Sequence, residues 1–403
     1  MCAGEMACNQ GVFSFGVVAS PLHDPSAVEE IVSGYTSLLA RLGGRRSDAA
    51  PSPVTVVATG GTEQILMDRW GGAGAPLVLV AHPGHNSLPA ALEALGRVQQ
   101  LGGRGVISYL DGPGDAAGAA HLDAWLSDLE VWRRLHETRI GLVGDPSDWL
   151  VASTPDEATV RGAWGPDVVR VPIEALVAGH SPDPSVSAPS GERTPDDVAA
   201  AAGVTPVLRT LIAEHRLDAV TVRCFDLIGA LGTTGCLALS ALNDDGMVAG
   251  CEGDVVSTIG MMWAAAVTGE VPWMANPARL SRHDGTIVLA HCTVPSTLVE
   301  SVRFDSHFES GIGVGISGDL EPGPVTVLRI GGRGLDRIWI VEGEVSSSGD
   351  DPGMCRTQAT VRIGARAADE LLRHPLGNHL VLVRGHHEAA LRRYHGWLVA
   401  ARD

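Results

Sequence analysis

Lysine is missing from this sequence altogether, so all 29 of its basic residues are arginine. The guanidinium group stays protonated and can neither form a Schiff base nor act as an amine nucleophile. Lysine-dependent aldolase, pyridoxal-phosphate and P-loop nucleotide hydrolase chemistry are therefore excluded. If the protein carries out carbonyl chemistry, it must use a metal ion or an acid–base pair.

Positive charge is scarce as well. The sequence holds 47 acidic residues against 29 basic ones, and its formal net charge is −18. Such a chain repels phosphate backbones, and no cluster of arginines interleaved with aromatic residues compensates for this. We therefore expect a small-molecule ligand and no nucleic-acid partner.

Long apolar runs are also lacking, and we expect no signal peptide. The longest apolar stretch, residues 255–267, is too short and too close to acidic residues to span a bilayer. Residues 1–5 lack the basic and apolar regions of a signal peptide. We expect no membrane partner and a cytoplasmic location.

The seven cysteines are scattered and contain no CxxC pair, which indicates reduced thiols that serve as small core residues. They are Cys2, Cys8, Cys224, Cys236, Cys251, Cys292 and Cys355.

Apolar runs alternate with helical patterns over the first third of the chain, which predicts a parallel sheet covered by helices. The expected strands are 12–18, 54–58, 77–81 and 106–109, and the expected helices are 89–100 and 119–135. The pattern restarts at Arg139 with a strand and a helix-capping Ser147, and it continues in strands 168–171, 218–222 and 247–250. A second, similar α/β domain is therefore expected.

After Pro272 the sequence changes to short β-like runs separated by glycine and proline, a texture typical of an antiparallel barrel or sandwich. We predict an α/β protein with two Rossmann-like parallel-sheet domains, 1–138 and 139–271, followed by a C-terminal antiparallel β-barrel domain with terminal helices, 272–403. The Pro/Ser-rich tract 181–195 is interpreted as an exposed connection.

Acidic residues follow two of the predicted strands. Asp226 comes after strand 218–222, and Glu252 and Asp254 come after strand 247–250. In α/β proteins, ligands bind at the carboxyl ends of the strands. Carboxylates that converge there either repel each other and share a proton or bind a divalent cation, for which a hard metal such as Mn²⁺ or Mg²⁺ is the natural choice. The simpler alternative for Asp254 is that it only caps the helix that follows.

Three histidines adjoin predicted strands or loops of the last domain: His379, His291 and His307. Most histidines satisfy local hydrogen bonds and take no part in chemistry. Position alone does not choose among them.

Several segments resemble the consecutive catalytic segments of the L-fucose/L-arabinose isomerase superfamily. They are 223–227, 237–244, 250–254, 285–291 and 377–379, in the same order. The resemblance covers roughly Val220 to the end of the chain, with a looser likeness at 59–63 and 82–87.

The resemblance implies a metal-dependent aldose–ketose isomerase that acts on a sugar or sugar derivative through an ene-diol. It implies catalytic roles for Asp226, Glu252 and Asp254, and a site for Mn²⁺, or Mg²⁺ or Co²⁺, formed by these three residues and His379. Substrate-binding roles follow for a further set: Glu63, His85, Asn86, His291 and His307. Which of Glu252 and Asp254 is the ligand and which the base stays open.

Other interpretations remain. A lyase, epimerase or dehydratase acting on a modified sugar would use the same site, and paired α/β domains could form a non-catalytic sugar-binding protein. The resemblance also implies a homo-oligomer, a trimer or hexamer, in which loop 82–87 of one chain covers the metal centre of its neighbour. Alternatively, Asn86 or Ser87 merely caps the helix beginning near Pro89.

Overall fold

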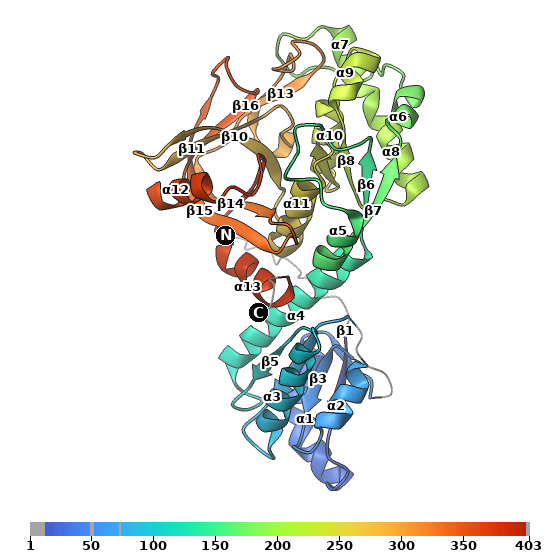
Figure 1. Cartoon of the computed structure of the whole chain (residues 1–403), viewed down its shortest axis with the longest axis vertical. Coiled ribbons are helices and arrows are strands. Elements are labelled where there is room, and N and C mark those ends of the chain that lie inside the picture. The colour runs from blue at the N-terminus through green and yellow to red at the C-terminus, as the bar shows by residue number, and fades with distance from the viewer. Residues whose placement is uncertain (1–12, 49–51, 72–73, 400–403) are drawn as a thin grey trace, which may run out of the picture. The chain divides into compact units, whose positions relative to one another are not determined.

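The computed structural model describes residues 13–48, 52–71 and 74–399 (Figure 1). The chain forms two compact units. The first comprises the described residues up to Trp132 together with Tyr394–Leu398, and the second runs from Arg133 to Arg393 and includes Val399. The predicted division into three domains stays a prediction.

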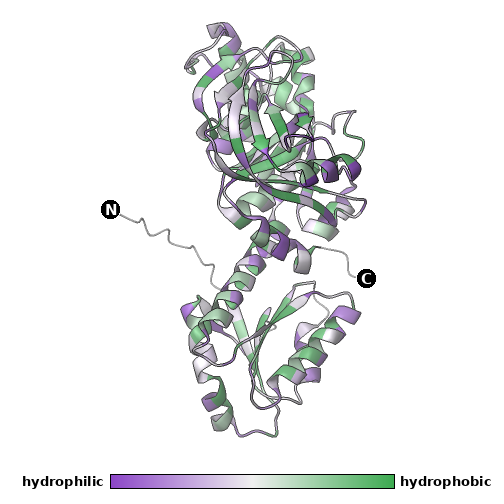
Figure 2. Ribbon diagram, turned by 90° about the vertical axis from the view of Figure 1, so that its left-hand side faces the viewer, coloured by the Kyte–Doolittle hydropathy of each residue, from purple (hydrophilic) through white to green (hydrophobic). Residues whose placement is uncertain are grey.

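A five-stranded parallel sheet forms the centre of the first unit, in the order β2-β1-β3-β4-β5. The direction in which strands are added reverses beside β1, which is where doubly wound sheets bind ligands. Figure 2 shows these strands as mostly hydrophobic. The strands are β1 (Phe13–Val18), β2 (Gly44–Arg46), β3 (Val54–Val57), β4 (Leu77–Ala81) and β5 (Gly105–Tyr109), and the helices are α1 (Pro25–Arg41), α2 (Glu63–Trp70), α3 (Ser87–Gln100) and α4 (Ala116–Glu137), which continues into the second unit.

The second unit begins with a four-stranded parallel sheet in the order β7-β6-β8-β9. Its strands are β6 (Arg139–Val143), β7 (Asp167–Val171), β8 (Ala219–Val222) and β9 (Val248–Cys251). The helices are α5 (Glu157–Trp164), α6 (Ile173–Gly179), α7 (Pro195–Ala202), α8 (Val204–His215), α9 (Phe225–Leu231), α10 (Cys236–Asp244) and α11 (Val255–Thr268).

A closed antiparallel barrel follows within the same unit, in the order β10-β11-β16-β15-β14-β17. Helix α11 packs against β8 and β9 on one side and against β14 and β17 of the barrel on the other, so it joins the two sheets (Figure 1). The barrel strands are β10 (Trp273–Ser281), β11 (Thr286–His291), β14 (Gly323–Gly331), β15 (Arg337–Gly349), β16 (Thr357–Arg362) and β17 (Leu380–Arg384), and the other elements are η1 (Ser296–Leu298), the ribbon β12 (Glu300–Asp305) and β13 (Gly315–Asp319), α12 (Ala365–Arg373) and α13 (Glu388–Leu398).

The predicted fold class is confirmed, since both parallel sheets and the antiparallel barrel are present. One local prediction is wrong: Ser147 caps no helix, because α5 begins only at Glu157. Instead, the backbone N–H of Ser147 donates to the carbonyl oxygen of Glu252 at 2.9 Å. Val12, which begins the expected strand 12–18, and residues 400–403 of the predicted C-terminal domain lie outside the described residues.

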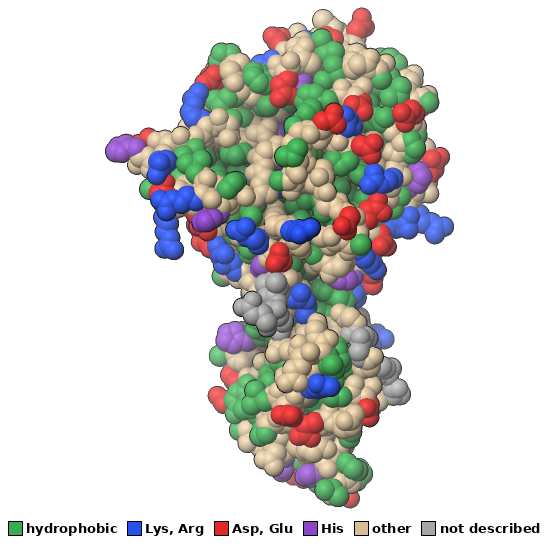
Figure 3. All heavy atoms as spheres, viewed as in Figure 1, with side chains coloured by type: hydrophobic (Ala, Val, Ile, Leu, Met, Phe, Trp, Pro, Cys, Tyr) green, Lys and Arg blue, Asp and Glu red, His purple; other side chains and the backbone are tan. Residues whose placement is uncertain are grey.

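Among the described residues, no helix is both long enough and apolar enough to cross a membrane. On the face shown in Figure 3, acidic and arginine side chains are interspersed. The five described cysteines form no disulfide, and four of them are buried; Cys2 and Cys8 lie outside the described residues.

The packing of α11 on β9 generates a stability prediction. A Cβ added to Gly250 would lie 2.2 Å from Oγ1 of Thr258, so Gly250→Ala should overpack this contact and lower the free energy of unfolding by about 1–3 kcal/mol. The matched control is Gly96→Ala inside α3, where an added Cβ meets nothing within 4 Å. It should instead stabilise the protein by about 0.5–1 kcal/mol, because alanine favours the helix. Denaturant unfolding that ranked the two variants equally would contradict this account of the contact.

Candidate metal centre

Three buried side chains of the second unit gather where the parallel sheet meets the barrel. Glu252 follows β9 directly, His291 ends β11, and His379 immediately precedes β17. One potential ligand atom from each lies within 4.8 Å of the others, and among the described residues these three form the group able to hold a metal ion. Segments far apart in sequence therefore supply one polar cluster.

The backbone at Glu252 is held in an unusual conformation. Glu252 has φ +64° and Gly253 has φ +69°, both in the left-handed region. For a residue with a Cβ this costs roughly 1–2 kcal/mol. At position 253 only glycine fits, because an added Cβ would lie 2.7 Å from the carbonyl oxygen of Asp145. Such strain is characteristic of functional positions, where the surrounding structure enforces it.

His379 is oriented by a carboxylate. Its Nδ1 lies 2.9 Å from Oδ2 of Asp254, and both side chains are completely buried. Asp254 also accepts hydrogen bonds from the backbone N–H of Ser257 at 2.8 Å and from its hydroxyl at 2.7 Å. The helix-capping role considered for Asp254 is thus present, and the carboxylate binds the imidazole as well.

Arg329 completes this arrangement from β14. Its guanidinium is 1% exposed and lies 3.5 Å from Oδ2 of Asp254. It also donates to the hydroxyls of Ser257 and Ser153. Gly377 allows this close approach, since a Cβ there would lie 2.3 Å from the guanidinium. A buried charge is tolerated only when it is paired and hydrogen-bonded, and here each partner meets that condition.

The electrostatics follow from burial and these contacts. Burial lowers the pKa of His379, but the Asp254 and Glu252 carboxylates outweigh burial and raise it to about 9. Burial would raise the pKa of Asp254, yet Arg329 and His379 hold it well below its usual range. For His291, burial and the nearby His379 lower the pKa to about 3, so this ring is neutral.

His379 and His291 differ in how well their hydrogen bonds suit them to bind a metal ion. His379 donates Nδ1–H to Asp254, and its buried Nε2 makes no hydrogen bond among the described residues although it lies 3.4 Å from Oε1 of Glu252. This is the arrangement expected of a metal-ligating histidine with its supporting carboxylate. His291 differs, because its Nδ1 accepts a hydrogen bond from the N–H of Thr293 at 3.2 Å. The neutral ring therefore carries its proton on Nε2.

An aromatic wall adjoins the cluster. The Nε1–H of Trp149 donates to Oε2 of Glu252 at 2.5 Å. The Trp149 ring meets the Phe225 ring edge to face at 4.8 Å, and Phe225 meets His307 in the same way at 5.4 Å. Beyond it, Oε2 of Glu309 lies 3.9 Å from Nε2 of His307. Burial and the charge of Glu252 raise the pKa of Glu309.

Asp226 lies in the first turn of α9 and is engaged otherwise. Its carboxylate accepts a hydrogen bond from Nε of Arg223 at 3.0 Å, and its side chain is 40% exposed. Arg223 also bonds the turn after β6, through the carbonyl of Pro146 and the carboxylate of Asp148. The structure thus brings Glu252, Asp254 and His379 together with His291, and ties Asp226 to Arg223.

The remaining predicted residues lie in the first unit. Glu63, His85 and Asn86 line a cavity of about 340 Å³, together with His23, Gly60, Gly61 and Pro89. The loops after β1, β3 and β4 form it, at the point where the strand order reverses. Asn86 occupies the N-cap position of α3, but its side chain makes no capping hydrogen bond, and the Ser87 hydroxyl donates to the carbonyl of Val57 instead.

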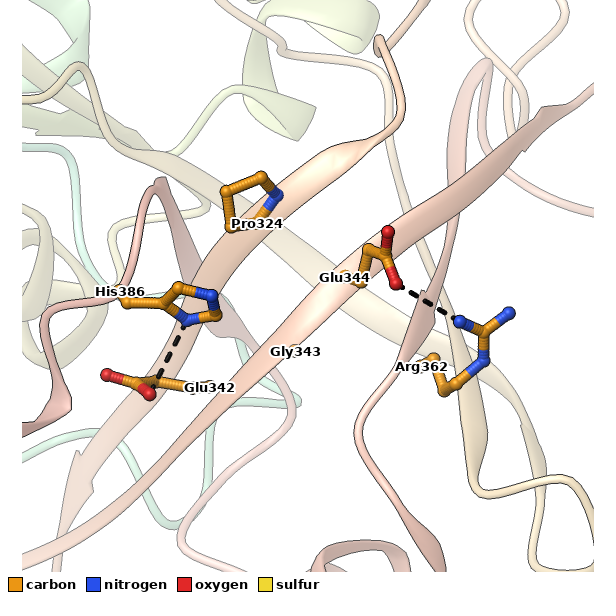
Figure 4. Close-up of a pocket in the computed structure, with 6 residues that line it drawn as sticks. All are labelled: Pro324, Glu342, Gly343, Glu344, Arg362 and His386. Atoms are coloured by element: carbon orange, nitrogen blue, oxygen red, sulfur yellow. Dashed lines mark hydrogen bonds and ion pairs between the residues drawn. The ribbon is translucent and has the colours of Figure 1, made fainter.

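Another cavity, of about 500 Å³, lies on the barrel (Figure 4). Its charged groups pair with each other: Glu342 with His386 at 3.4 Å, and Glu344 with Arg362 at 3.1 Å. These ion pairs satisfy the charges that a ligand would otherwise meet.

Comparison with known proteins shows similarity to sugar isomerases. The chain is 25% identical over 223 residues to the sulfoquinovose isomerase of Priestia aryabhattai, a match covering 50% of this chain and 49% of that protein. It is 24% identical over 242 residues to the one of Alkalicoccus urumqiensis, covering 56% and 55%, and 23% identical over 290 residues to the one of Clostridium sp. (strain MSTE9), covering 64% and 62%.

The chain therefore spans about half the length of the first of these relatives. No protein-family model matches it. The similarities confirm the resemblance to the fucose isomerase-like superfamily that the sequence segments indicated.

Sequence reasoning missed Trp149, Arg329 and Glu309. An arginine inside the apolar run of β14 was a usable signal, because an arginine in such a strand needs a buried partner. Glu309 lies two residues from His307, which had been singled out. Nothing in the sequence links Trp149 to Glu252, which lies 103 residues further on.

The raised pKa of His379 predicts how the stability of the metal-free protein depends on pH. The folded state holds the His379 proton up to about pH 9, whereas the unfolded state releases it near the ordinary value of 6.5. The stabilisation is therefore complete below pH 6.5 and is lost as the pH rises through 9, on the order of 3 kcal/mol in total.

Denaturant unfolding in excess chelator at several pH values measures this loss. The control is His379→Asn, whose amide can keep the hydrogen bond to Asp254 but does not titrate. If wild type and variant lost stability equally between pH 6.5 and 9, the raised pKa would be refuted.

Proposed function

We propose that this protein is a metal-dependent sugar isomerase that interconverts an aldose and a ketose through an ene-diol. The observation that carries the proposal is the buried Nε2 of His379, which lacks a hydrogen bond, faces Glu252, and is oriented through Nδ1 by Asp254. Similarity to sulfoquinovose isomerases supports the same reaction class.

Glu252 and His379 would hold the cation through Oε1 and Nε2. A carboxylate with an imidazole suits a transition metal such as Mn²⁺ or Co²⁺ better than Mg²⁺, which prefers oxygen ligands. When bound, the cation polarises the sugar carbonyl and so acidifies the adjacent C–H. Asp226 remains the predicted further ligand, and one of its two oxygens accepts the hydrogen bond from Arg223.

The other polar groups have roles that follow from their protonation. Neutral His291, with its proton on Nε2, donates a hydrogen bond to a substrate oxygen on which negative charge develops. Glu309, a half-exposed carboxyl with a raised pKa, takes the proton from one carbon and returns it to the next. Asp254 acts through His379, whose tautomer and orientation it fixes.

The substrate is a sugar or sugar derivative. Sulfoquinovose is the first candidate to test, because the relatives carry that name. Incubation of the protein and Mn²⁺ in D₂O with sulfoquinovose and a panel of aldoses and ketoses, followed by NMR, detects both C–H exchange and the product formed.

Metal removal and matched asparagine variants test the site. Excess EDTA should abolish exchange, and Mn²⁺ should restore it. His379→Asn should weaken Mn²⁺ binding at least about 100-fold, since a ligand is lost and even supporting residues contribute 10–100-fold. His291→Asn keeps an acceptor for Thr293 but lacks the Nε2 donor, so it should retain Mn²⁺ and slow exchange by about 10²–10³-fold.

Glu309→Gln should likewise retain Mn²⁺ and slow exchange by about 10²–10⁴-fold, because it removes the proposed base. Asp226→Asn should weaken Mn²⁺ binding if Asp226 is a ligand. Calorimetric titration of the metal-free variants measures binding separately from turnover. Full activity after confirmed metal removal would refute the proposal. Equal loss of Mn²⁺ in His291→Asn and His379→Asn would make His291 a ligand instead of a donor.

The cavity of the first unit supports a homo-oligomer, a trimer or hexamer. In this assembly loop 82–87 of one chain would complete the site of a neighbouring chain. Its polar lining, with Glu63, His85 and Asn86, matches what a sugar requires. Mixing an inactive His85→Ala/Asn86→Ala variant with an inactive Glu252→Gln variant should then restore part of the activity after subunit exchange. Each variant mixed with itself is the control. A fully active monomer, or no recovery in exchanging mixtures, would show that each chain works alone.

A further inference from the structure

Trp149 is unusual because its indole N–H is hydrogen-bonded in the candidate site while much of the side chain is exposed to solvent. Its Nε1–H is committed to Oε2 of Glu252 at 2.5 Å, while half of the side-chain surface is exposed. Large aromatic side chains usually bury their apolar surface. An indole that is fixed at one edge and open on the rest, beside a buried polar cluster, therefore calls for an explanation.

The turn that carries Trp149 is attached to the backbone of Glu252. Ser147 N–H donates to the carbonyl of Glu252 at 2.9 Å, and Leu150 N–H donates to the carbonyl of Ser147 at 2.9 Å, with the Leu150 side chain buried. Arg223 adds a hydrogen bond to the carbonyl of Pro146 at 2.7 Å. The turn is thus fixed relative to the backbone of Glu252.

The hydrogen bond from Trp149 also gives the two carboxylate oxygens of Glu252 different partners. Oε2 accepts the indole N–H, whereas Oε1 lies 3.4 Å from Nε2 of His379 and 3.9 Å from Nε2 of His291. The indole N–H occupies one lone pair of Oε2 and so favours Oε1, which faces both imidazoles, as the oxygen that binds a cation. A carboxylate held to one-oxygen binding leaves more coordination positions free for a substrate.

We propose that Trp149 is a positioning residue that restricts Glu252 to one ligating oxygen, and that its open face is the platform on which the apolar side of the sugar ring stacks. The edge-to-face contact with Phe225 at 4.8 Å holds the indole plane in place for this. The inference rests on the proposed function and adds a specificity surface to it.

Two substitutions separate the two roles. Trp149→Phe keeps an aromatic face but removes the N–H donor, so Mn²⁺ affinity of the metal-free protein should fall about tenfold, as for other residues that orient a ligand. The value of kcat should fall and KM should change little. Trp149→Ala removes the aromatic face as well, so in this variant KM should also rise, by about tenfold. Val151→Ala, in the same loop with an exposed side chain, is the control.

Calorimetric titration with Mn²⁺ and steady-state kinetics provide the readouts, and tryptophan fluorescence gives a third. Paramagnetic Mn²⁺ bound next to Glu252 should quench the emission of Trp149, so the quenching seen in wild type should largely disappear in Trp149→Phe. Circular dichroism checks that each variant is folded.

The outcomes are distinct. Wild-type protein that binds no Mn²⁺ contradicts the proposed function, and this inference falls with it. Wild-type protein that binds Mn²⁺ and converts a sugar, with Trp149→Phe equal to it in affinity, kcat and quenching, overturns the positioning role alone. An unchanged KM in Trp149→Ala overturns the platform.

Discussion

The buried carboxylate of Asp254 is the contact on which the rest of the second unit depends. It lies between Nδ1 of His379 at 2.9 Å and the guanidinium of Arg329 at 3.5 Å, and it caps α11 at the same time. These groups come from the end of the parallel sheet, from barrel strand β14 and from the residue just before barrel strand β17. Removing one partner of such a buried pair leaves an uncompensated charge, at a cost on the order of 3–5 kcal/mol. The junction of sheet and barrel is therefore organised around one charge.

The same contact prepares the chemistry. Because Asp254 binds Nδ1 of His379, the opposite nitrogen, Nε2, faces Glu252 with no hydrogen bond. The left-handed backbone at Glu252 brings its carboxylate to that nitrogen, and Gly253 makes the tight turn beneath Asp145 possible. The contacts of Asp254, His379 and Glu252 thus both stabilise the junction of sheet and barrel and form the candidate site. This accounts for the strained backbone and the buried polar groups occurring together at this junction.

The fold class could be predicted because strands buried on both faces, such as β4, are continuous apolar runs, and the change after Pro272 marks the barrel. Local elements were missed where the pattern was weak or interrupted. Strand β2 has only three residues, and β10 contains Pro277 at an irregularity in its pairing with β11. Helix α1 did carry a signal, since Asp24 caps it and Pro25 begins it.

The candidate site was predictable only in part. Glu252 and His379 stand at strand ends and in segments with a family likeness, so the sequence indicated them. The pairing of Asp254 with Arg329 depends on which strands adjoin in the barrel, and the bond from Trp149 to Glu252 depends on how two loops meet. Neither contact can be predicted from the local sequence, because the residues in each pair are far apart in the chain. The partner of Asp226 is local, since Arg223 lies three residues before it, and this pairing was not predicted.

We propose that Glu252 and His379 form a metal centre. A crystal structure of the protein with Mn²⁺, with anomalous diffraction data collected at the manganese edge, tests it most directly. We expect an anomalous peak within bonding distance of Oε1 of Glu252 and Nε2 of His379, with Nδ1 of His379 still hydrogen-bonded to Asp254. A peak elsewhere, or none at saturating Mn²⁺, would contradict it.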